Sequence, residues 1–187
     1  ISVHDRPISN KEKLVTWCGR LETNNKRVDL MIDIWARVCK EHPEWQLALM
    51  GLEEAKGLPE YAQSVGAENI EFTGLVKAEE YYQKASIICH TSLSESFGLV
   101  LVEAMNYGCV PIAFDSFPAC KDLIPSDCGY LISAFDKKQY AEVLSNLMNS
   151  QGELQSRVPK CKEYSRKFNE EDSLNKWIKI IENSKHK

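Results

Sequence analysis

The 187-residue sequence predicts a single α/β domain whose six-stranded parallel sheet is covered by helices on both faces. Two observations predict this fold class. Short, continuous apolar runs alternate along the chain with longer segments whose apolar residues recur at helical spacing. The short runs do not alternate between apolar and polar residues, and strands of this kind are buried on both faces, as they are in parallel sheets.

The first half of the chain contains three expected strands, each followed by an expected helix. The first strand ends at Gly19, and the apolar stripe of the helix after it continues until Pro43 forces a stop. The second and third strands end at Gly51 and Gly74. In chain order, these elements are expected at residues 14–18, 28–39, 46–50, 59–64, 69–73 and 79–85.

The second half continues the same alternation. Strands are expected at 87–91, 109–114 and 129–132, with helices at 98–107 and around 140–148. Two more helices close the chain, the last striped with Leu174, Trp177, Ile178 and Ile181. Six such strands make a doubly wound, Rossmann-like sheet, in which ligands bind beyond the carboxyl ends of the strands. The candidate site residues are therefore those that follow each strand.

Composition excludes several classes of protein. With 43% hydrophobic and 27% charged residues, the chain has the composition of a soluble globular protein. Its net charge of -4 disfavours nucleic acid as a partner, because proteins that bind nucleic acid carry basic surfaces. No apolar run approaches the ~20 residues of a transmembrane helix, and the first residues do not form a signal peptide. The seven cysteines include no CxxC pair, which favours a reduced, cytoplasmic protein.

The basic C-terminal segment and the four histidines are expected to have structural or surface roles. From Lys160 onward the chain is mildly basic, which favours a solvated helix face, with peripheral contact at the inner face of a membrane as the alternative. His4, His42 and His186 are expected at the surface. His90 ends an apolar strand, where a buried or crevice-edge histidine is favoured over a catalytic base.

A basic loop follows the first strand. Arg20 and Lys26 flank its polar residues just before a helix begins. Two cations beside a helix N-terminus suit a phosphate, because the helix dipole and the free N–H groups favour negative charge there. A solvated basic loop is the alternative, and the loop matches neither GxxxxGK[ST] nor GxGxxG.

The segment after the fourth strand brings two acids to one helix. Glu95 lies in the loop, Ser96 is a candidate cap near Gly98, and Glu103 shares a helical stripe with Leu99. A carboxylate on a partly apolar stripe needs a hydrogen-bonding partner. A structural Lys or Arg and the vicinal hydroxyls of a ribose are equally compatible partners for Glu103.

Glu95 and Glu103, separated by seven residues within SxxESFGLVLVEAMNYGCVPIAF, resemble the E-x7-E signature of the glycosyl transferase group 1 family. The segments GRL…KRVDLMIDIW, PEWQLALMG, IEFTGLV and YYQKASIICHTSLSESFG occur in the family's order, so the resemblance runs from Val15 to about Ile180. The family consists of retaining glycosyltransferases with the GT-B fold, which has two Rossmann-like halves. The chain resembles the C-terminal half, which binds the nucleotide-sugar donor.

The resemblance implies roles for individual residues. Arg20, Lys26 and Glu95 are implied as catalytic, with the two cations on the donor diphosphate and Glu95 beside the donor sugar. Glu103 is implied to accept hydrogen bonds from the ribose. The other implied donor contacts are the backbone of Phe97, Gly98 and Leu99 on the sugar and phosphates, Gly74, Leu75 and Val76 on the base, and Gly51 in the same crevice.

This sequence departs from the family's pattern at two places. The loop between Arg20 and Lys26 is one residue longer than usual, which affects the spacing of the two cations. Arg27 and Ser96 replace frequent glycines. Ser96 is compatible with the family's loop if its φ is negative and it caps the helix, although it leaves less room near the sugar.

The resemblance also implies the substrates and the boundaries. The donor is a nucleoside-diphosphate sugar, UDP- or GDP-linked, and neither a metal nor a cofactor is expected. The acceptor is a glycan, a lipid-linked sugar or a polysaccharide, bound by a missing N-terminal domain. Residues 1–13 are then a linker remnant, 14–168 the donor-binding domain, and 169–187 a helix that packs toward the missing domain. Alone, the chain is expected to bind the donor with little or no transfer.

Two other functions stay open at the level of sequence. A nucleotide-sugar epimerase of related fold binds a similar donor without an acceptor, and product analysis without an acceptor separates it from a transferase. A non-catalytic nucleotide-binding or assembly module would have the same fold without catalytic activity. The joint presence of Arg20, Lys26, Glu95 and Glu103 argues against a decayed site.

Overall fold

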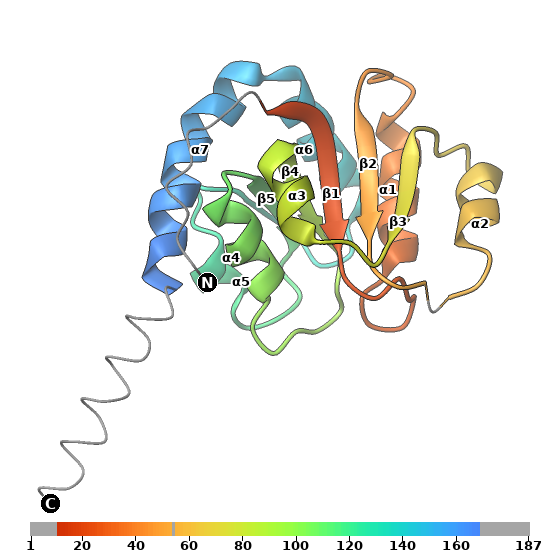
Figure 1. The fold of residues 1–187 in the computed structure, drawn as a ribbon, viewed down its shortest axis with the longest axis horizontal. Coiled ribbons are helices and arrows are strands. Elements are labelled where there is room, and N and C mark those ends of the chain that lie inside the picture. The colour runs from red at the N-terminus through yellow and green to blue at the C-terminus, as the bar shows by residue number, and fades with distance from the viewer. Residues whose placement is uncertain (1–10, 54, 169–187) are drawn as a thin grey trace, which may run out of the picture.

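One sheet of six strands runs through the described residues, 11–53 and 55–168, of the computed structural model (Figure 1). The strands are β1 (Glu12–Cys18), β2 (Gln46–Met50), β3 (Ile70–Gly74), β4 (Ala85–His90), β5 (Val110–Phe114) and β6 (Tyr130–Ile132). Each neighbouring pair is parallel. The spatial order β3-β2-β1-β4-β5-β6 is that of a doubly wound, Rossmann-like sheet, so the predicted fold class is confirmed.

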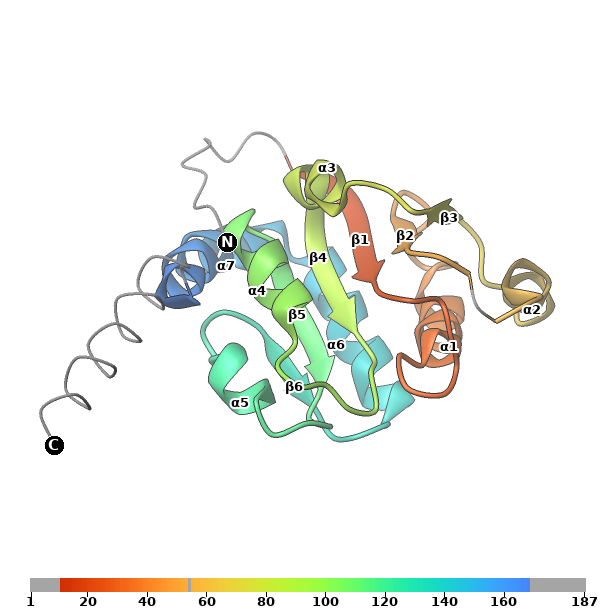
Figure 2. The same cartoon turned by 60° about the horizontal axis from the view of Figure 1, so that its bottom comes forward.

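Helices cover both faces of this sheet, as the two views in Figures 1 and 2 show. They are α1 (Val28–Val38), α2 (Leu58–Ser64), α3 (Ala78–Lys84), α4 (Leu99–Asn106), α5 (Cys120–Leu123), α6 (Lys137–Asn149) and α7 (Gln151–Ser165), with a 3-10 turn η1 (Arg166–Phe168). One core cluster joins the sheet to α1 and α6, and a second joins it to α3, α4 and α5.

The central strand β4 explains why the apolar runs are continuous. All six of its residues are buried. Ile87 and Cys89 belong to the cluster under α1 and α6, whereas Ile88 belongs to the cluster under α3 and α4. Because successive side chains point to opposite faces and both faces are covered, apolar residues are favoured at every position.

The elements expected at stated positions begin and end within three residues of them, with three differences of substance. The short helix α5 was not expected, because its four residues are too few to show a helical period. His42, expected at the surface, is 3% exposed, and its Nε2 lies 2.7 Å from Ser145 Oγ on α6, so that prediction was wrong. β1 begins at Glu12, inside the range expected as linker. The closing helix with Trp177 lies outside the described residues.

The cysteines and the helices add two further findings. All seven cysteines lie in the described ranges and are free thiols, and all except the half-buried Cys18 are buried. Among the described residues, no helix combines the length and the hydropathy needed to cross a membrane.

Candidate functional site

The candidate site lies where β1 and β4 run side by side, at the point where the strand order reverses direction. Figure 2 brings the carboxyl ends of the strands forward, with the loops that leave β1 and β4. Asn25 joins these two loops. Its Nδ2 donates to Ser94 O and its Oδ1 accepts from Ser94 N, each at 3.1 Å, and its carbonyl accepts from Leu93 N at 2.6 Å. The loops are therefore held together by both main chain and side chain.

Glu22 shapes the loop after β1 from inside. Its side chain is buried, and its carboxylate accepts hydrogen bonds from the backbone N–H groups of Asn24, Asn25 and Lys26 at 2.6, 2.9 and 2.5 Å. Burial raises the pKa of Glu22, but these hydrogen bonds and the charge of Arg20 outweigh burial and lower the pKa overall. The loop after β1 is thus a turn closed on an internal carboxylate.

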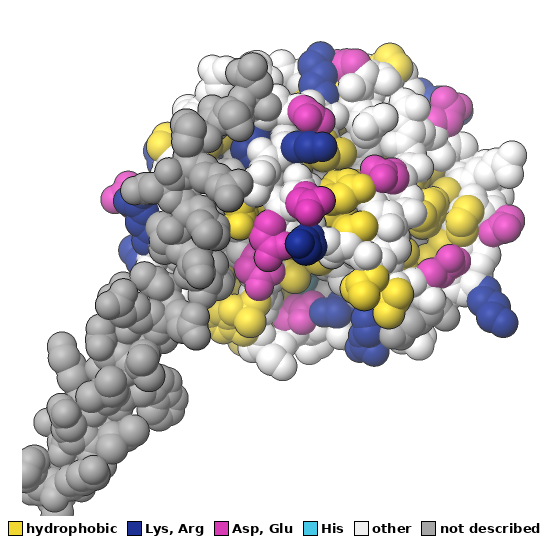
Figure 3. All heavy atoms as spheres, in the orientation of Figure 1, with side chains coloured by type: hydrophobic (Ala, Val, Ile, Leu, Met, Phe, Trp, Pro, Cys, Tyr) yellow, Lys and Arg dark blue, Asp and Glu magenta, His cyan; other side chains and the backbone are white. Residues whose placement is uncertain are grey.

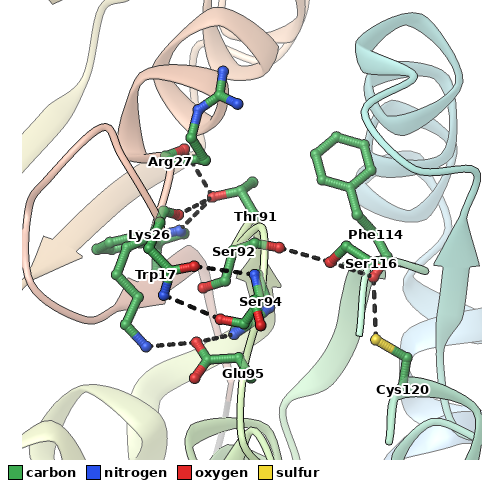
Figure 4. A network of polar contacts seen from close by, with 12 residues as sticks. Trp17, Lys26, Arg27, Thr91, Ser92, Ser94, Glu95, Phe114, Ser116 and Cys120 are labelled. Carbon is green, nitrogen blue, oxygen red and sulfur yellow. Dashed lines mark hydrogen bonds and ion pairs between the residues drawn. The ribbon is translucent and has the colours of Figure 1, made fainter. Parts of the chain in front are cut away.

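Lys26 and Glu95, both expected site residues, meet directly (Figure 4). Lys26 Nζ lies 2.5 Å from Glu95 Oε1, and the two side chains are 21% and 14% exposed. His90 Nε2 lies 3.2 Å from the same oxygen. Burial raises the pKa of Glu95, but hydrogen bonds with His90, Lys26 and Ser92 outweigh it and lower the pKa to about 2. The carboxylate is therefore ionised at any physiological pH.

Thr91 holds the backbone at Lys26 in place. Trp17 Nε1 donates to Thr91 Oγ1 at 2.9 Å, and Thr91 Oγ1 lies 3.1 and 3.0 Å from the carbonyls of Lys26 and Arg27 (Figure 4). All of Thr91 is buried. On the other side of the loop after β4, Ser116 Oγ donates to Ser92 O at 2.6 Å. Polar contacts to β1 and to the segment after β5 thus hold the loop after β4 in place.

Arg27 and Ser96 occupy the two positions where the resemblance implied glycine. Arg27 precedes α1 with φ 54°, a left-handed conformation that glycine adopts readily, and its guanidinium pairs with Asp29 at 3.1 Å. Ser96 was expected to cap α4, but the residue at the N-cap is Gly98, with no side-chain cap. The prediction for Ser96 was therefore wrong, because the loop reaches the helix through a left-handed glycine instead.

Gly98 is required by space as well as by conformation. Its φ is 91°, and a Cβ there would lie 3.0 Å from Phe117 Cζ and 3.2 Å from Leu123 Cδ1. Its neighbours Phe97 and Leu99 are 38% and 53% exposed. The free backbone N–H groups of the first turn of α4 therefore begin close to the loop that carries Glu95.

Glu103 lies farther along α4 and is half-buried. Burial raises its pKa, and the negative charge of Glu79 on α3 raises it further. Figure 3 shows acidic side chains, with lysines or arginines between them, over the face that α3 and α4 form. Among residues 11–53 and 55–168, no Lys or Arg forms an ion pair with Glu103, so the alternative of a structural cation finds no partner there.

The glycines after β2 and β3 bring the remaining strand ends together. Gly51, with φ 144°, leaves no room for a Cβ, which would lie 1.8 Å from Gly19 O. Its N–H donates to Gly74 O at 2.9 Å. Gly51 therefore adjoins the loop of Arg20. Gly74 ends β3, the edge strand of the sheet, and the exposed Leu75 and Val76 follow it. The structure brings Lys26, Glu95 and His90 into contact. The residues expected to contact the base lie at the carboxyl end of β3, which β2 separates from β1.

Sequence reasoning missed three residues of the site. Glu22 and Asn25 were regarded only as parts of a polar loop, and His90 was expected to be a buried or crevice-edge histidine without a role in the site. The only local signal was an acid placed just before a turn-forming TNN. Within the described ranges, no three His, Cys, Asp or Glu side chains gather in a way that would hold a metal ion.

Known proteins resemble this chain over nearly its whole length. The family "Glycosyl transferases group 1" matches residues 3–168. The amylovoran biosynthesis glycosyltransferase AmsD of Erwinia amylovora is 28% identical over 182 residues, which are 95% of this chain and 50% of AmsD. The chain therefore spans about half the length of that relative.

Solved structures share the fold. The pneumococcal O-GlcNAc transferase GtfA, in complex with UDP and GlcNAc, superposes with a TM-score of 0.86 at 24% identity, over 100% of this chain and 38% of GtfA. The C-terminal domain of a glycosyl transferase group 1 family protein (LpcC) from Francisella tularensis gives 0.74 at 23% identity, over 84% of this chain and 87% of that domain. The fold is that of one half of a GT-B enzyme.

Proposed function

Because the chain belongs to the glycosyl transferases group 1 family, we propose that it forms the donor-binding half of a retaining glycosyltransferase. The donor is a nucleoside-diphosphate sugar, with UDP or GDP as the nucleotide. The observation that carries the proposal is the contact of Lys26 with Glu95 at the switch point of the sheet, because it places a cation and an ionised acid where such sheets bind ligands.

Each group in the crevice has a role in breaking the bond between sugar and phosphate. Negative charge develops on the leaving diphosphate, and Arg20, Lys26 and the N-terminus of α4 stabilise it without a metal ion. Positive charge develops on the sugar, and Glu95 stabilises it or holds a hydroxyl of the donor sugar. Glu95 is not proposed as a nucleophile.

The nucleoside lies along the same edge of the sheet. Glu103 accepts hydrogen bonds from the ribose hydroxyls, which supply the partner that its half-buried carboxylate lacks among the described residues. Gly51 gives the backbone room to approach, and the loop of Gly74, Leu75 and Val76 contacts the base. The backbone of Phe97, Gly98 and Leu99 faces the sugar and the phosphates.

The whole enzyme needs a second half. We propose that the acceptor, a glycan, a lipid-linked sugar or a polysaccharide, binds to an N-terminal domain outside this chain, and that the enzyme is cytoplasmic, with peripheral membrane contact as the alternative. The isolated chain then has little or no transfer activity. Measured turnover by purified 1–187 on a polysaccharide acceptor would contradict this part of the proposal.

The experiment that tests the proposal is a thermal-shift screen of the protein with UDP, GDP and their sugars. A ligand present at 100 times its Kd stabilises the folded state by about 2.7 kcal/mol, which raises the melting temperature measurably. One nucleotide series is expected to raise it, and no response to either series would contradict donor binding. Product formed from the donor without any acceptor would indicate an epimerase, and binding with no chemistry by the full-length protein would indicate a non-catalytic module.

A further inference from the structure

We propose that His90 is a positioning residue for Glu95, and that it holds this acid in place when the donor draws Lys26 away. The inference rests on the proposed donor function. His90 is the last residue of β4, its side chain is 4% exposed, and its Nε2 lies 3.2 Å from Glu95 Oε1. Its backbone N–H donates to Tyr140 Oη at 3.1 Å, so both ends of the residue are fixed.

The state of Glu95 determines which nitrogen of His90 carries the proton. An ionised carboxylate has no proton to donate, and Glu95 is ionised because its pKa is lowered to about 2. The hydrogen bond must therefore run from His90 Nε2–H to Glu95 Oε1. His90 Nδ1 is buried and has no hydrogen-bond partner among the described residues. A ring that carries a proton on Nε2 satisfies the contact with Glu95, whereas Nδ1 stays without a partner among the described residues.

Packing alone does not account for a histidine at this position. The ring lies 5.5 Å from the ring of Phe117, a member of the core cluster under α3, α4 and α5, and an apolar side chain would pack against Phe117 as well. A buried nitrogen without a partner is destabilising relative to such a residue. The unpaired Nδ1 thus lowers stability, and the hydrogen bond from Nε2 to Glu95 is the contact that accounts for a histidine here.

The need for this hydrogen bond follows from the charge of the donor. In the structure, Glu95 Oε1 receives Lys26 Nζ and His90 Nε2 together. A diphosphate attracts the ammonium group of Lys26, which then shares or leaves its contact with Glu95. Without His90, Glu95 would then face an anion as a largely buried charge with Ser92 as the remaining partner among those that lower its pKa. His90 keeps the carboxylate hydrogen-bonded and aimed at the sugar.

The consequence is a selective effect on the sugar. Loss of His90 should leave the affinity for the bare nucleoside diphosphate nearly unchanged, because the phosphate cations remain. It should reduce the additional affinity that the sugar moiety provides. The measured quantity is the ratio of the Kd of the nucleoside diphosphate to the Kd of the nucleoside-diphosphate sugar. Loss of a hydrogen bond to a charged group should lower this ratio about tenfold.

Four variants test the inference by calorimetry with UDP, GDP and their sugars. His90→Leu removes the donor nitrogen, whereas His90→Gln places an amide N–H near the position of Nε2 and should restore the ratio. His90→Asn is too short to reach Glu95. His42→Leu is the matched control, because His42 is equally buried but bonds Ser145, away from the crevice.

The expected result is a ratio reduced about tenfold in His90→Leu and His90→Asn and retained in His90→Gln and His42→Leu. Equal ratios in His90→Gln and His90→Asn would overturn the inference even if His90→Leu does not fold. Absence of nucleotide binding by the unaltered protein would instead contradict the proposed function. A spectroscopic readout is independent of ligand: ¹⁵N NMR should find a proton on His90 Nε2, and a ring protonated only at Nδ1 would overturn the inference.

Discussion

Lys26 Nζ lies 2.5 Å from Glu95 Oε1, although the two residues are 69 positions apart in the sequence. The contact follows from the strand order, since Lys26 is in the loop after β1 and Glu95 is in the loop after β4, and these strands are neighbours. The reciprocal hydrogen bonds of Asn25 with Ser94 hold the same two loops in register. A cation and an acid are thereby presented together at the edge of the sheet.

Glu95 should make stability depend on acid pH. Its pKa is about 2 in the folded protein against an ordinary 4.5, so the stability that its ionised form contributes is fully present above about pH 4.5 and is lost as the pH falls toward 2. Urea midpoints measured from pH 2.5 to pH 6 should therefore fall less steeply in Glu95→Gln than in the unaltered protein. Glu142→Gln, which changes a 61% exposed carboxylate, should keep the original slope. Superimposable profiles for Glu95→Gln and the unaltered protein would contradict this.

Glu22→Gln should disorganise the loop after β1. The amide would turn its N–H₂ toward backbone N–H groups that now bond a carboxylate, and we expect a loss of about 1–3 kcal/mol in the free energy of unfolding. Because the Lys26 backbone is one of these donors, nucleotide affinity should fall as well. Urea unfolding and calorimetry measure the two effects, with the exposed Glu44→Gln as control. A stable variant with unchanged affinity would show that Glu22 does not shape the site.

Two glycines should respond differently to a methyl group. Gly51→Ala places a Cβ 1.8 Å from Gly19 O, so the loop that carries Arg20 must move, and we expect destabilisation of more than ~2 kcal/mol. Gly74→Ala meets nothing within 4 Å and has only its left-handed φ of 67° to overcome, which costs about 1–2 kcal/mol. Urea unfolding of both variants checks the order. Equal losses would mean that Gly51 and Gly19 are not in close contact.

Glu103 should make nucleotide affinity depend on pH. Burial and the charge of Glu79 raise its pKa, and only the ionised carboxylate can accept hydrogen bonds from both ribose hydroxyls. The affinity for a nucleoside diphosphate should therefore rise as the pH rises through this raised pKa. A 2′,3′-dideoxy analogue lacks the hydroxyls and should show no such rise. Parallel pH profiles for the two ligands would assign the dependence to another group.

The sequence predicted the fold and part of the site for identifiable reasons. Continuous apolar runs that end at Gly19, Gly51 and Gly74 located the strand ends. The basic loop and the family resemblance pointed to Lys26 and Glu95, which the structure brings into contact. The contact of Lys26 with Glu95 was not predictable from spacing, because it depends on which strands are neighbours. Glu22 and His90 were missed because their roles depend on contacts in the folded protein. Glu22 accepts hydrogen bonds from the backbone of its loop, and His90 bonds Glu95.

Calorimetric titration of the protein with UDP, GDP and their sugars, compared with Lys26→Ala, tests the central claim most directly. Lys138→Ala is the matched control, because this lysine on α6 has a side chain that is 83% exposed. We expect one nucleotide to bind, and its affinity to fall by about 1–3 kcal/mol in Lys26→Ala, the contribution of a charge-assisted contact, but not in Lys138→Ala. Affinity that is unchanged in Lys26→Ala, or that falls equally in both variants, would contradict a diphosphate site at the junction of β1 and β4.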